Sequence, residues 1–326
     1  KYRQLQLRRN HSSSVPNSID IYDPIYGQYL PELPLFSNTE EQQRYFALNL
    51  QDQIFLNDQW SVLFGARFDH ITQDFQNKLT DTSSKKDLQQ TSPRLGLNYR
   101  LNDRWSWYAN YGESFALNSG MDRNGDVFNP EKGKSYEIGG KYRITSQSLL
   151  SLALFKMDKE NVLTTDPTDS NYQITAGEVS SKGLEVDLET QLNDQFSIRA
   201  NYSYTDAQVE KDQSLAKGSR LSNVPKHSGS ISSNYEWTLA NADKVGLGAT
   251  AIYVGKRSGH STDNGFNLPE YTLLNLNAYY APTDQLRYQF NVHNLLDETY
   301  YVASYSDMWI QPGDPLNASI SVQWKF

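Results

Sequence analysis

The sequence predicts an all-β protein, a transmembrane antiparallel up-and-down β-barrel, from three observations. The first is composition: only 37% of the 326 residues are apolar, yet 13% are aromatic. A soluble core of this size needs more aliphatic residues, and disordered chains are poor in aromatics. The second is an apolar–polar alternation of period two, and the third is an alternation of short and long connections. A wall with one face in lipid and the other in a wet lumen accounts for all three.

The period-two alternation is clearest at the end of the chain. Over residues 319–326, Ser, Ser, Gln and Lys alternate with Ile, Val, Trp and Phe, so one face suits water and the other lipid. Similar patterns predict about 14 strands, near 1–9, 42–56, 60–76, 89–101, 105–116, 132–144, 148–160, 172–191, 195–209, 223–239, 244–257, 269–281, 286–299 and 316–326. Helical spacing is not sustained anywhere.

The predicted connections alternate in length along the chain. Short ones lie at 57–59, 102–104, 145–147, 193–195, 240–243 and 283–285, and long ones near 10–41, 77–88, 117–131, 161–171, 210–222, 258–268 and 300–315. The short ones are rich in Asn, Asp, Ser and Thr, which suit tight turns. Short periplasmic turns and long outer loops are typical of outer-membrane barrels. Counting back from the last strand puts every short turn, and Lys1, on the periplasmic side, so we expect the chain to begin near a periplasmic turn.

Charge and residue usage exclude several classes of function. The net charge of −8 disfavours a nucleic-acid partner, and the chain has no cysteine for a disulfide or thiolate site. The five histidines are scattered without the spacing of metal ligands. The run Asp122-Arg-Asn-Gly-Asp126 hints at a calcium loop, but its glycine comes one place early, so we interpret it as an outer-loop turn. We therefore expect no catalytic residues and no metal site.

A series of motifs occurs in order along the chain: YDPIYG at 22–27, QDQI at 51–54 with GARFD at 65–69, SPRLGLNY at 92–99 with WYANYGESF at 107–115, SKGLE at 181–185 and NLLDETYY at 294–301. Their order and spacing resemble the barrel of TonB-dependent outer-membrane ferric-siderophore receptors. The resemblance is nearest to receptors for hydroxamate or mixed-ligand siderophores. The GDPLN run at 313–317 departs from their pattern, with Leu316 where arginine is usual.

The resemblance implies a barrel of 22 strands closed by an N-terminal plug. With about 14 strands visible, we expect residues 1–326 to be the C-terminal part of the barrel, with the plug, the first strands and the TonB box outside this chain. The implied function is uptake of a ferric siderophore across the bacterial outer membrane, energised by the TonB–ExbB–ExbD complex. The iron would arrive already chelated, so neither a cofactor nor an enzymatic activity is expected. Outer-membrane lipid, lipopolysaccharide and the barrel-assembly machinery would be further partners.

Aromatic residues of the long loops are the candidate siderophore contacts, because rigid aromatic faces lose little entropy on binding. The first choices are Tyr305 and Trp309 in the last long loop, followed by Tyr301, Tyr300 and, in the first long loop, Tyr26. For Tyr300 and Tyr301 an interfacial aromatic girdle is an equally good interpretation.

Charges on the polar phase of the strands are expected to face the lumen. They are Arg67, Arg199, Arg287, Glu185 and Asp187. An arginine facing lipid at the midplane would cost ~2–4 kcal/mol, which enforces this phase. We expect Asp187 and Arg199 to lie nearly opposite each other across the short turn at 193–195. Contact with a plug and a hydrated network along the wall both remain open as roles.

Two other classes of protein share parts of this pattern. A passive porin or secretion barrel closes without a plug, so the full-length sequence distinguishes it from a receptor. An extracellular β-rich adhesin would be soluble without detergent, whereas extraction only by detergent and heat-modifiable migration would exclude it.

Overall fold

The computed structural model describes residues 2–12, 22, 35–260 and 264–325. Fourteen strands form one antiparallel sheet. They are β1 (Tyr2–Ser12), β2 (Leu35–Phe55), β3 (Trp60–Asn77), β4 (Thr82–Arg100), β5 (Trp105–Ala116), β6 (Glu131–Thr145), β7 (Ser148–Thr165), β8 (Gln173–Gln191), β9 (Phe196–Lys211), β10 (His227–Thr238), β11 (Lys244–Val254), β14 (Tyr271–Ala281), β15 (Leu286–His293) and β18 (Asn317–Trp324). Two small hairpins, β12 (Arg257–Ser258) with β13 (Asn267–Leu268) and β16 (Tyr301–Ser306) with β17 (Trp309–Pro312), stand in the loops. The predicted all-β class and strand number are confirmed.

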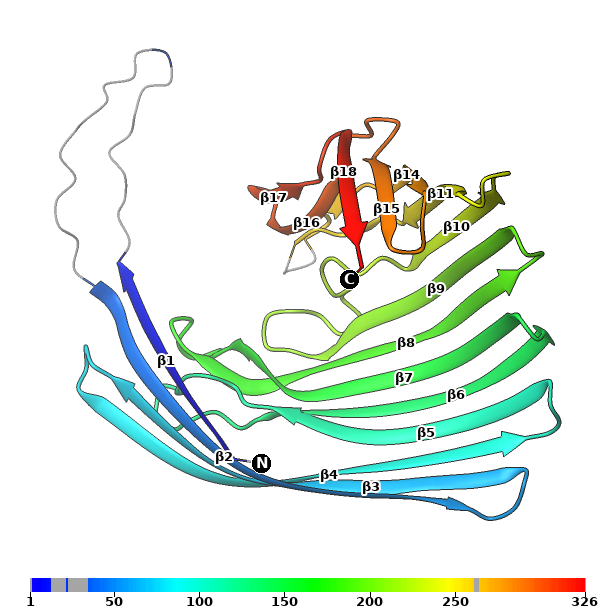
Figure 1. The fold of residues 1–326 in the computed structure, drawn as a ribbon. Helices are drawn as coiled ribbons and strands as arrows, with labels where there is room; N and C mark the ends of the chain where they lie inside the picture. The colour runs from blue at the N-terminus through cyan, green and yellow to red at the C-terminus, as the bar shows by residue number, and fades with distance from the viewer. Residues whose placement is uncertain (1, 13–21, 23–34, 261–263, 326) are drawn as a thin grey trace.

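The sheet is a curved wall whose strands follow each other in chain order (Figure 1). Its two edges are β1 and β18, and among the described residues no pairing joins them. The short turns lie at one end of the strands and the long loops at the other (Figure 1). The up-and-down order and the predicted asymmetry of the connections are therefore both present. No helix in the described part of the chain is long and apolar enough to cross a membrane.

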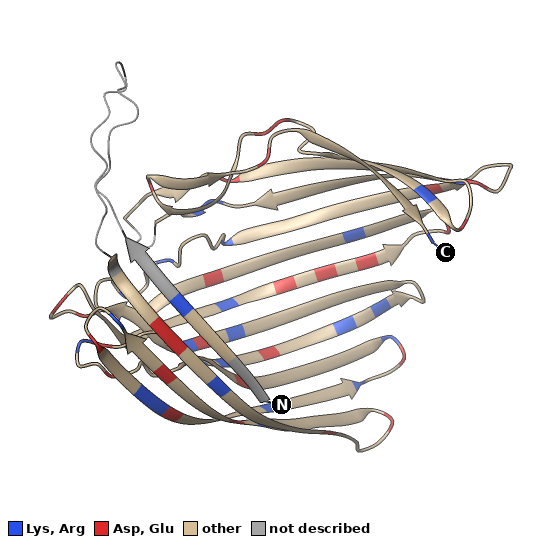
Figure 2. Cartoon of the chain, turned by 60° about the vertical axis from the view of Figure 1, so that its left-hand side comes forward, with Lys and Arg blue, Asp and Glu red and all other residues tan. Residues whose placement is uncertain are grey.

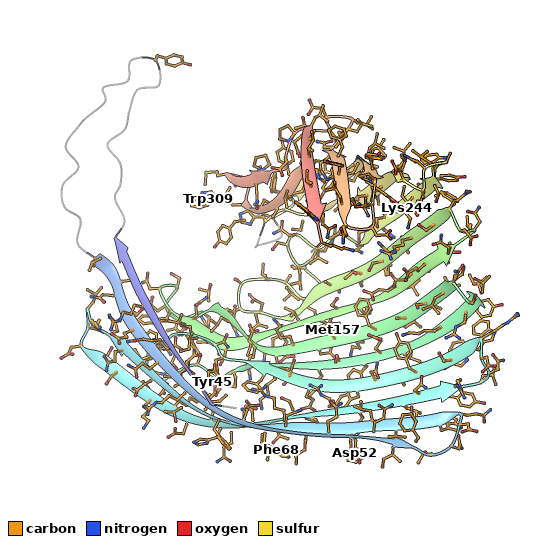
Figure 3. All side chains as sticks on the ribbon, viewed as in Figure 1. Tyr45, Asp52, Phe68, Met157, Lys244 and Trp309 are labelled. Atoms are coloured by element: carbon orange, nitrogen blue, oxygen red, sulfur yellow. The ribbon has the colours of Figure 1, made fainter. Side chains whose placement is uncertain are left out.

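The two faces of the wall differ in polarity. Phe68 points from the convex face, whereas Tyr45 and Met157 lie on the concave face (Figure 3). The strand register aligns convex apolar residues into lateral rows, such as Ile138, Leu154 and Leu184 on β6, β7 and β8. We call the exposed part of these rows the apolar belt: Leu48, Leu50, Phe64, Phe68, Leu95, Leu97, Ile138, Leu152, Leu154, Ile231, Leu247, Leu276, Phe290, Ile320 and Val322. A continuous apolar face of this extent requires lipid rather than water as its neighbour.

Asparagine side chains close several of the short turns. The Oδ1 atom of Asn57 accepts hydrogen bonds from the amides of Gln59 and Trp60, both at 2.9 Å. Asn102 and Asn193 form the same pair of bonds in their own turns. The asparagine replaces the ladder partners that these amides lose where the strands separate. The predicted turn chemistry is therefore observed directly.

Two expectations about the strands need correction. Lys1, which was expected at the short-turn end, lies outside the described residues, but its neighbour Tyr2 pairs with Phe46 near the middle of β2 and not at the short-turn end. On the loop side, β4 begins at Thr82 instead of residue 89, and β7 continues to Thr165 instead of 160. Beyond the apolar belt both faces of a strand are polar, so period-two alternation disappears while the backbone ladder continues.

Candidate ligand-binding site

A buried arginine fixes the last long loop at the loop end of the barrel. Arg257 is only 1% exposed. Its Nη2 atom donates to the carbonyl groups of Tyr301 and Val302, the latter at 3.0 Å, and its guanidinium lies 5.5 Å from the ring centroid of Tyr271. Burial lowers the pKa of Arg257 from its ordinary value. The cation is thus satisfied by backbone carbonyls and an aromatic face, and it holds β16 in place.

Asn223 joins a second loop to the same hairpin. Its side chain forms two bonds with the Ser304 backbone, donating to the carbonyl at 2.8 Å and accepting from the amide at 2.9 Å. Its own amide donates to the carbonyl of Ser258 at 2.8 Å, and the Ser304 hydroxyl donates to the carbonyl of Gly259. The positive φ of 63° that this geometry requires is tolerated by asparagine. Three long loops are therefore tied into one unit.

The outer end of the β16–β17 hairpin carries the largest exposed aromatic and apolar side chains of this unit. Tyr305 is 72% exposed, Met308 84% and Trp309 73%. With Ala303, Ile310 and their neighbours they line a groove of about 530 Å³. Figure 3 shows Trp309 at the loop end of the molecule, on the side toward which the sheet is concave. We call Tyr305, Met308 and Trp309 the aromatic tip.

The predicted aromatic contacts fall into different environments. Tyr305 and Trp309 lie together in the aromatic tip. Tyr300 instead packs on Tyr271, with ring centroids 4.7 Å apart, and Tyr301 is half-buried with its carbonyl bound to Arg257. The structure thus brings the first two together at the tip and places Tyr301 at the base of the hairpin, as the first residue of β16, with Tyr300 just before it. The prediction for Tyr26 falls outside the described residues.

A second loop, residues 117–130, folds against the concave face through a buried polar cluster. Glu41 is 2% exposed and Gln73 is fully buried. Gln73 Nε2 donates to Glu41 Oε1 at 2.7 Å and to the carbonyl of Asn118 at 2.8 Å, and the hydroxyl of Ser119 also donates to Glu41. Phe128 of the same loop is also buried, with 6% of its surface exposed. Sequence reasoning missed this cluster, whose only signal was polar residues on the inward phase of two strands.

The run at 122–126 forms a compact turn in this loop. Asp122 Oδ1 accepts from the amides of Asn124 and Asp126 at 2.9 and 3.0 Å, and Gly125 has a φ of +83°. The carboxylate is used to hold its own backbone, which supports the interpretation as an outer-loop turn. Within the described residues, no group of His, Asp and Glu side chains is arranged to hold a metal ion.

An ion pair links this loop to the next one and gives a pH-dependent contact. The Thr168 amide donates to Asp166 at 2.8 Å, and the Arg123 guanidinium lies 3.5 Å from the same carboxylate. These contacts, the amide first, hold the pKa of Asp166 below its ordinary value. A lowered folded-state pKa means that the contact stabilises the loops above the unfolded pKa, ~3.9, and is lost as the pH falls through the folded pKa.

We therefore expect the Thr168 amide of the wild type to keep its hydrogen-exchange protection above about pH 5 and to lose it as the pH falls below about 4, after correction for intrinsic rates. In Asp166→Asn the protection should be lower at pH 5 and nearly independent of pH. Identical pH profiles for the two proteins would contradict the assignment.

The predicted lumenal charges lie on the concave face, and one pairing differs from the expectation. Arg199 lies opposite Glu189 and forms an ion pair with it at 2.8 Å, whereas Asp187 lies opposite Asn201. The bonds from Asn193 to two successive amides centre the turn one residue later, which shifts the register. Glu185, Asp187 and Glu189 form an acidic row along one face of β8 (Figure 2).

The other predicted lumenal arginines are also engaged within the wall. Arg67 donates through Nε and Nη2 to both oxygens of Asp69, each at 2.7 Å. The guanidinium of Arg287 lies 3.6 Å from the ring centroid of Tyr279. Arg67 is thus held by a carboxylate and Arg287 by an aromatic face, both within the wall.

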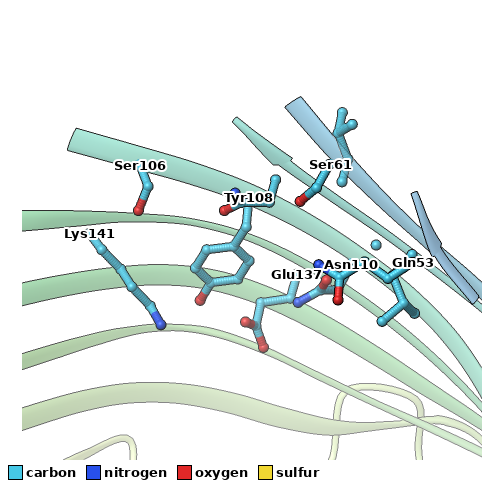
Figure 4. Close-up of a pocket in the computed structure, with 11 residues that line it drawn as sticks. Gln53, Ser61, Ser106, Tyr108, Asn110, Glu137 and Lys141 are labelled. Atoms are coloured by element: carbon cyan, nitrogen blue, oxygen red, sulfur yellow. The ribbon is translucent and has the colours of Figure 1, made fainter. Parts of the chain in front are cut away.

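Toward the short-turn end the concave face has a polar hollow of about 500 Å³ (Figure 4). Its lining includes Tyr108, Asn110, Glu137 and Lys141, and Lys141 Nζ lies 5.8 Å from the ring centroid of Tyr108. Mixed charges and amides of this kind can hydrogen-bond water or a polypeptide equally well. The hollow is therefore polar and is not an apolar ligand pocket.

Comparisons with known proteins agree with this architecture. The model of the family described as "TonB dependent receptor-like, beta-barrel" matches residues 2–295. The Metal-pseudopaline receptor CntO of Pseudomonas aeruginosa is 40% identical over 323 residues, covering 97% of this chain and 46% of the receptor. The Ferrioxamine B receptor of Salmonella typhimurium is 31% identical over 332 residues, covering 98% of this chain and 46% of the receptor. The chain thus spans about half the length of these relatives.

Solved structures show the same fold. The ferric-catecholate import receptor Fiu of Escherichia coli, in its closed form, superposes with a TM-score of 0.80 at 21% identity, covering 100% of this chain and 51% of that one. The siderophore receptor PiuA of Acinetobacter baumannii gives 0.79 at 21% identity, covering 93% and 46%. With its curved up-and-down sheet, its lipid-facing belt and a family match over most of its length, the chain belongs to the TonB-dependent receptor β-barrel family of the bacterial outer membrane.

Proposed function

We propose that the receptor containing this chain imports a metal chelate across the outer membrane, with a ferric siderophore as the expected cargo. The observation that carries this proposal is a rigidly held aromatic tip at the loop end of a TonB-dependent receptor barrel. Relatives named as metal-pseudopaline and ferrioxamine B receptors support the substrate class. TonB-dependent receptors are transport receptors, and we propose no catalytic step.

The chemistry of the tip suits such a cargo. A metal chelate is a bulky polar complex wrapped in organic ligand, and flat aromatic faces can pack on it without fitting one metal. Arg257 and Asn223 hold the hairpin before binding, so little ordering entropy is lost when the ligand docks. The metal would travel as cargo inside its chelator and would need no protein ligands.

Transport requires parts of the receptor beyond residues 1–326. We propose that a plug fills the lumen against the concave charges, including Glu185 and Arg287, and that the TonB–ExbB–ExbD complex displaces it. The remaining barrel strands would also come from the part of the receptor outside residues 1–326, and the barrel-assembly machinery would insert the complete barrel into the outer membrane. Half-length coverage of the relatives supports this arrangement.

The decisive experiment measures binding of a panel of metal chelates to the full-length receptor in detergent. The panel holds ferric hydroxamate, catecholate and mixed-ligand siderophores, together with a metal–pseudopaline complex, the ligand class named for one relative. At least one should bind at micromolar concentration or tighter. Binding of haem or cobalamin, with no binding of any of these chelates, would refute the proposed substrate class.

Trp309→Ala should weaken binding of the identified chelate by about tenfold or more, because buried aromatic contacts are common hot spots. Titration by intrinsic fluorescence or calorimetry measures the change. Trp237→Ala is the matched control, because this tryptophan of β10 lies at the short-turn end of its strand and should leave affinity within twofold. Equal loss in both variants would show that the effect comes from stability and not from contact.

A further inference from the structure

The buried polar cluster beneath loop 117–130 contains a carboxylate that has no countercharge. Glu41 is 2% exposed, and it accepts hydrogen bonds from the neutral side chains of Gln43, Gln73 and Ser119. In the described part of the chain, no lysine or arginine forms an ion pair with it. An ionised carboxylate that is taken out of water is costly unless an opposite charge compensates it. A positive charge would therefore be stabilised at this place.

The lysine that the register places beside this cluster is engaged elsewhere. Lys86 of β4 lies opposite Gln73 of β3. Its ammonium group donates to the carbonyl group of Val127 and to Oδ1 of Asn129, both at 2.9 Å. Two of its three donors are thus bound to uncharged oxygen atoms of the loop. The charge of Glu41 is not balanced by direct contact with this lysine.

The side-chain carbonyl of Gln73 gives a second, independent observation. Gln73 is fully buried, and its neighbours on the same face of β3, Ile71 and Phe75, are buried as well. Its Nε2 atom donates to Glu41 and Asn118, whereas its Oε1 atom has no hydrogen-bond partner among the described residues. A buried acceptor without a partner destabilises a fold, so such an atom requires an explanation.

Turning the Gln73 amide over exchanges its oxygen and nitrogen atoms and brings the oxygen into the cluster. The position of the nitrogen lies 2.7 Å from Glu41 Oε1 and 2.8 Å from the carbonyl oxygen of Asn118. An oxygen at this position would face two other oxygen atoms, which repel one another unless a cation lies among them. The hydroxyl of Ser119 contacts the second carboxylate oxygen of Glu41. The turned amide therefore completes an all-oxygen set drawn from β2, β3 and the loop.

We propose that Glu41, Gln73, Asn118 and Ser119 bind a hard cation, Na⁺ or Ca²⁺, which fastens loop 117–130 to the inner face of β2 and β3. Carboxylate, amide, carbonyl and hydroxyl oxygens are the ligands that such cations prefer. With a single charged ligand, the dissociation constant for Ca²⁺ is expected to be on the order of 1 mM. Because only one ligand is acidic, the site is not a group of His, Asp and Glu side chains. The proposal does not depend on the identity of the cargo.

The test measures hydrogen exchange in the loop of the full-length receptor, which is purified in detergent with EDTA and then freed of the chelator. Exchange of the amides of residues 117–130 is followed by mass spectrometry in choline chloride, NaCl and CaCl₂ at equal ionic strength. At ten times its dissociation constant, the bound cation should raise the protection of the loop by about tenfold over choline. The salt that gives this protection identifies the cation.

Two substitutions should change the response in opposite directions. Glu41→Gln keeps the shape of the side chain but removes the charged ligand, so an added cation should change protection by less than about twofold. Gln73→Glu adds a second carboxylate, so Ca²⁺ should bind about tenfold more tightly, although in choline its loop should be less protected than in the wild type. Glu40→Gln is the matched control, because Glu40 is the next residue on the other face of β2, where it pairs with Lys78. This control should keep the wild-type response.

Several outcomes would overturn the proposal. They are equal wild-type protection in all three salts, a full response in Glu41→Gln, and an equal loss of response in Glu40→Gln. Lower protection of Gln73→Glu in every salt would show a hydrogen-bonded cluster that rejects a second carboxylate and holds no cation. If Glu41→Gln does not fold, as judged by heat-modifiable migration, Ser119→Ala removes only a neutral ligand and should weaken cation binding by about threefold or more. Unchanged binding in Ser119→Ala would then reject the site.

Discussion

Replacing Leu154 by arginine should destabilise the barrel by about 1–3 kcal/mol, because a cation on the lipid-facing wall costs ~2–4 kcal/mol at the midplane and less toward the interface, and Lys156 already stands two residues farther along the same face. Leu154 is 52% exposed on the convex face and lies between Ile138 and Leu184 on the neighbouring strands. An arginine there would replace an aliphatic contact with lipid by an unsolvated guanidinium. Equilibrium unfolding of the full-length receptor in lipid vesicles, followed by tryptophan fluorescence, measures the difference in free energy.

The adjacent position gives the matched control. Ala153 lies on the concave face, where the register places it opposite Glu185. An arginine at 153 would meet water and a carboxylate, so Ala153→Arg should change the unfolding free energy by less than about 1 kcal/mol. If both arginine variants cost the same, the assignment of the two faces is wrong.

Arg257→Met should release the β16–β17 hairpin and cost about 2–5 kcal/mol locally. Methionine matches the length of the arginine stem but leaves the carbonyl groups of Tyr301 and Val302 without their donor, at about 1–3 kcal/mol for each buried group. The β16–β17 amides should then exchange faster, and the tip near Asp307 should be cleaved more readily by protease. The affinity for the chelate should fall as well, because the aromatic tip is no longer held in place before the ligand binds.

Arg257→Lys separates charge from shape. Lysine keeps the cation but cannot span two carbonyl groups with a planar fork, so it should restore only part of the protection. Full protection of the hairpin in Arg257→Met would contradict the anchoring role.

The residues that the sequence placed well are those whose environment is decided locally. Leu154 alternates with polar neighbours because each strand separates lipid from water, and Asn193 marks its turn because its side chain bonds the next amides. The same alternation of apolar and polar residues predicts which face Arg67 occupies and how many strands there are. The predicted strand ends on the loop side were wrong for the same reason: beyond the apolar belt both faces are polar, so the alternation that marks a strand disappears.

Contacts made over long sequence distances escaped prediction. The sequence placed Arg257 at the end of a strand and gave no sign of its anchoring role. Its partners are backbone carbonyl groups 12 and 45 residues away, and a backbone carbonyl leaves no signature in the sequence. The bonds that join Glu41 and Gln73 to Asn118 and Ser119 exist only because loop 117–130 folds over both strands. The pairing of Arg199 with Glu189 in place of Asp187 depended on a turn centre that composition alone does not fix.

The strand order of the sheet sets how it can assemble. From β1 to β11 every pairing joins neighbours along the chain, and β14, β15 and β18 continue this order after two inserted hairpins. Each step closes one connection between successive strands, short at one end of the wall and longer at the other, and the entropic cost of closure grows only slowly with loop length. Within the described residues, the outer edges of β1 and β18 pair with no other strand. A pairing that joined the two ends of a closed barrel would bring together strands far apart in the sequence, so it would be the slow, high-contact-order step of assembly.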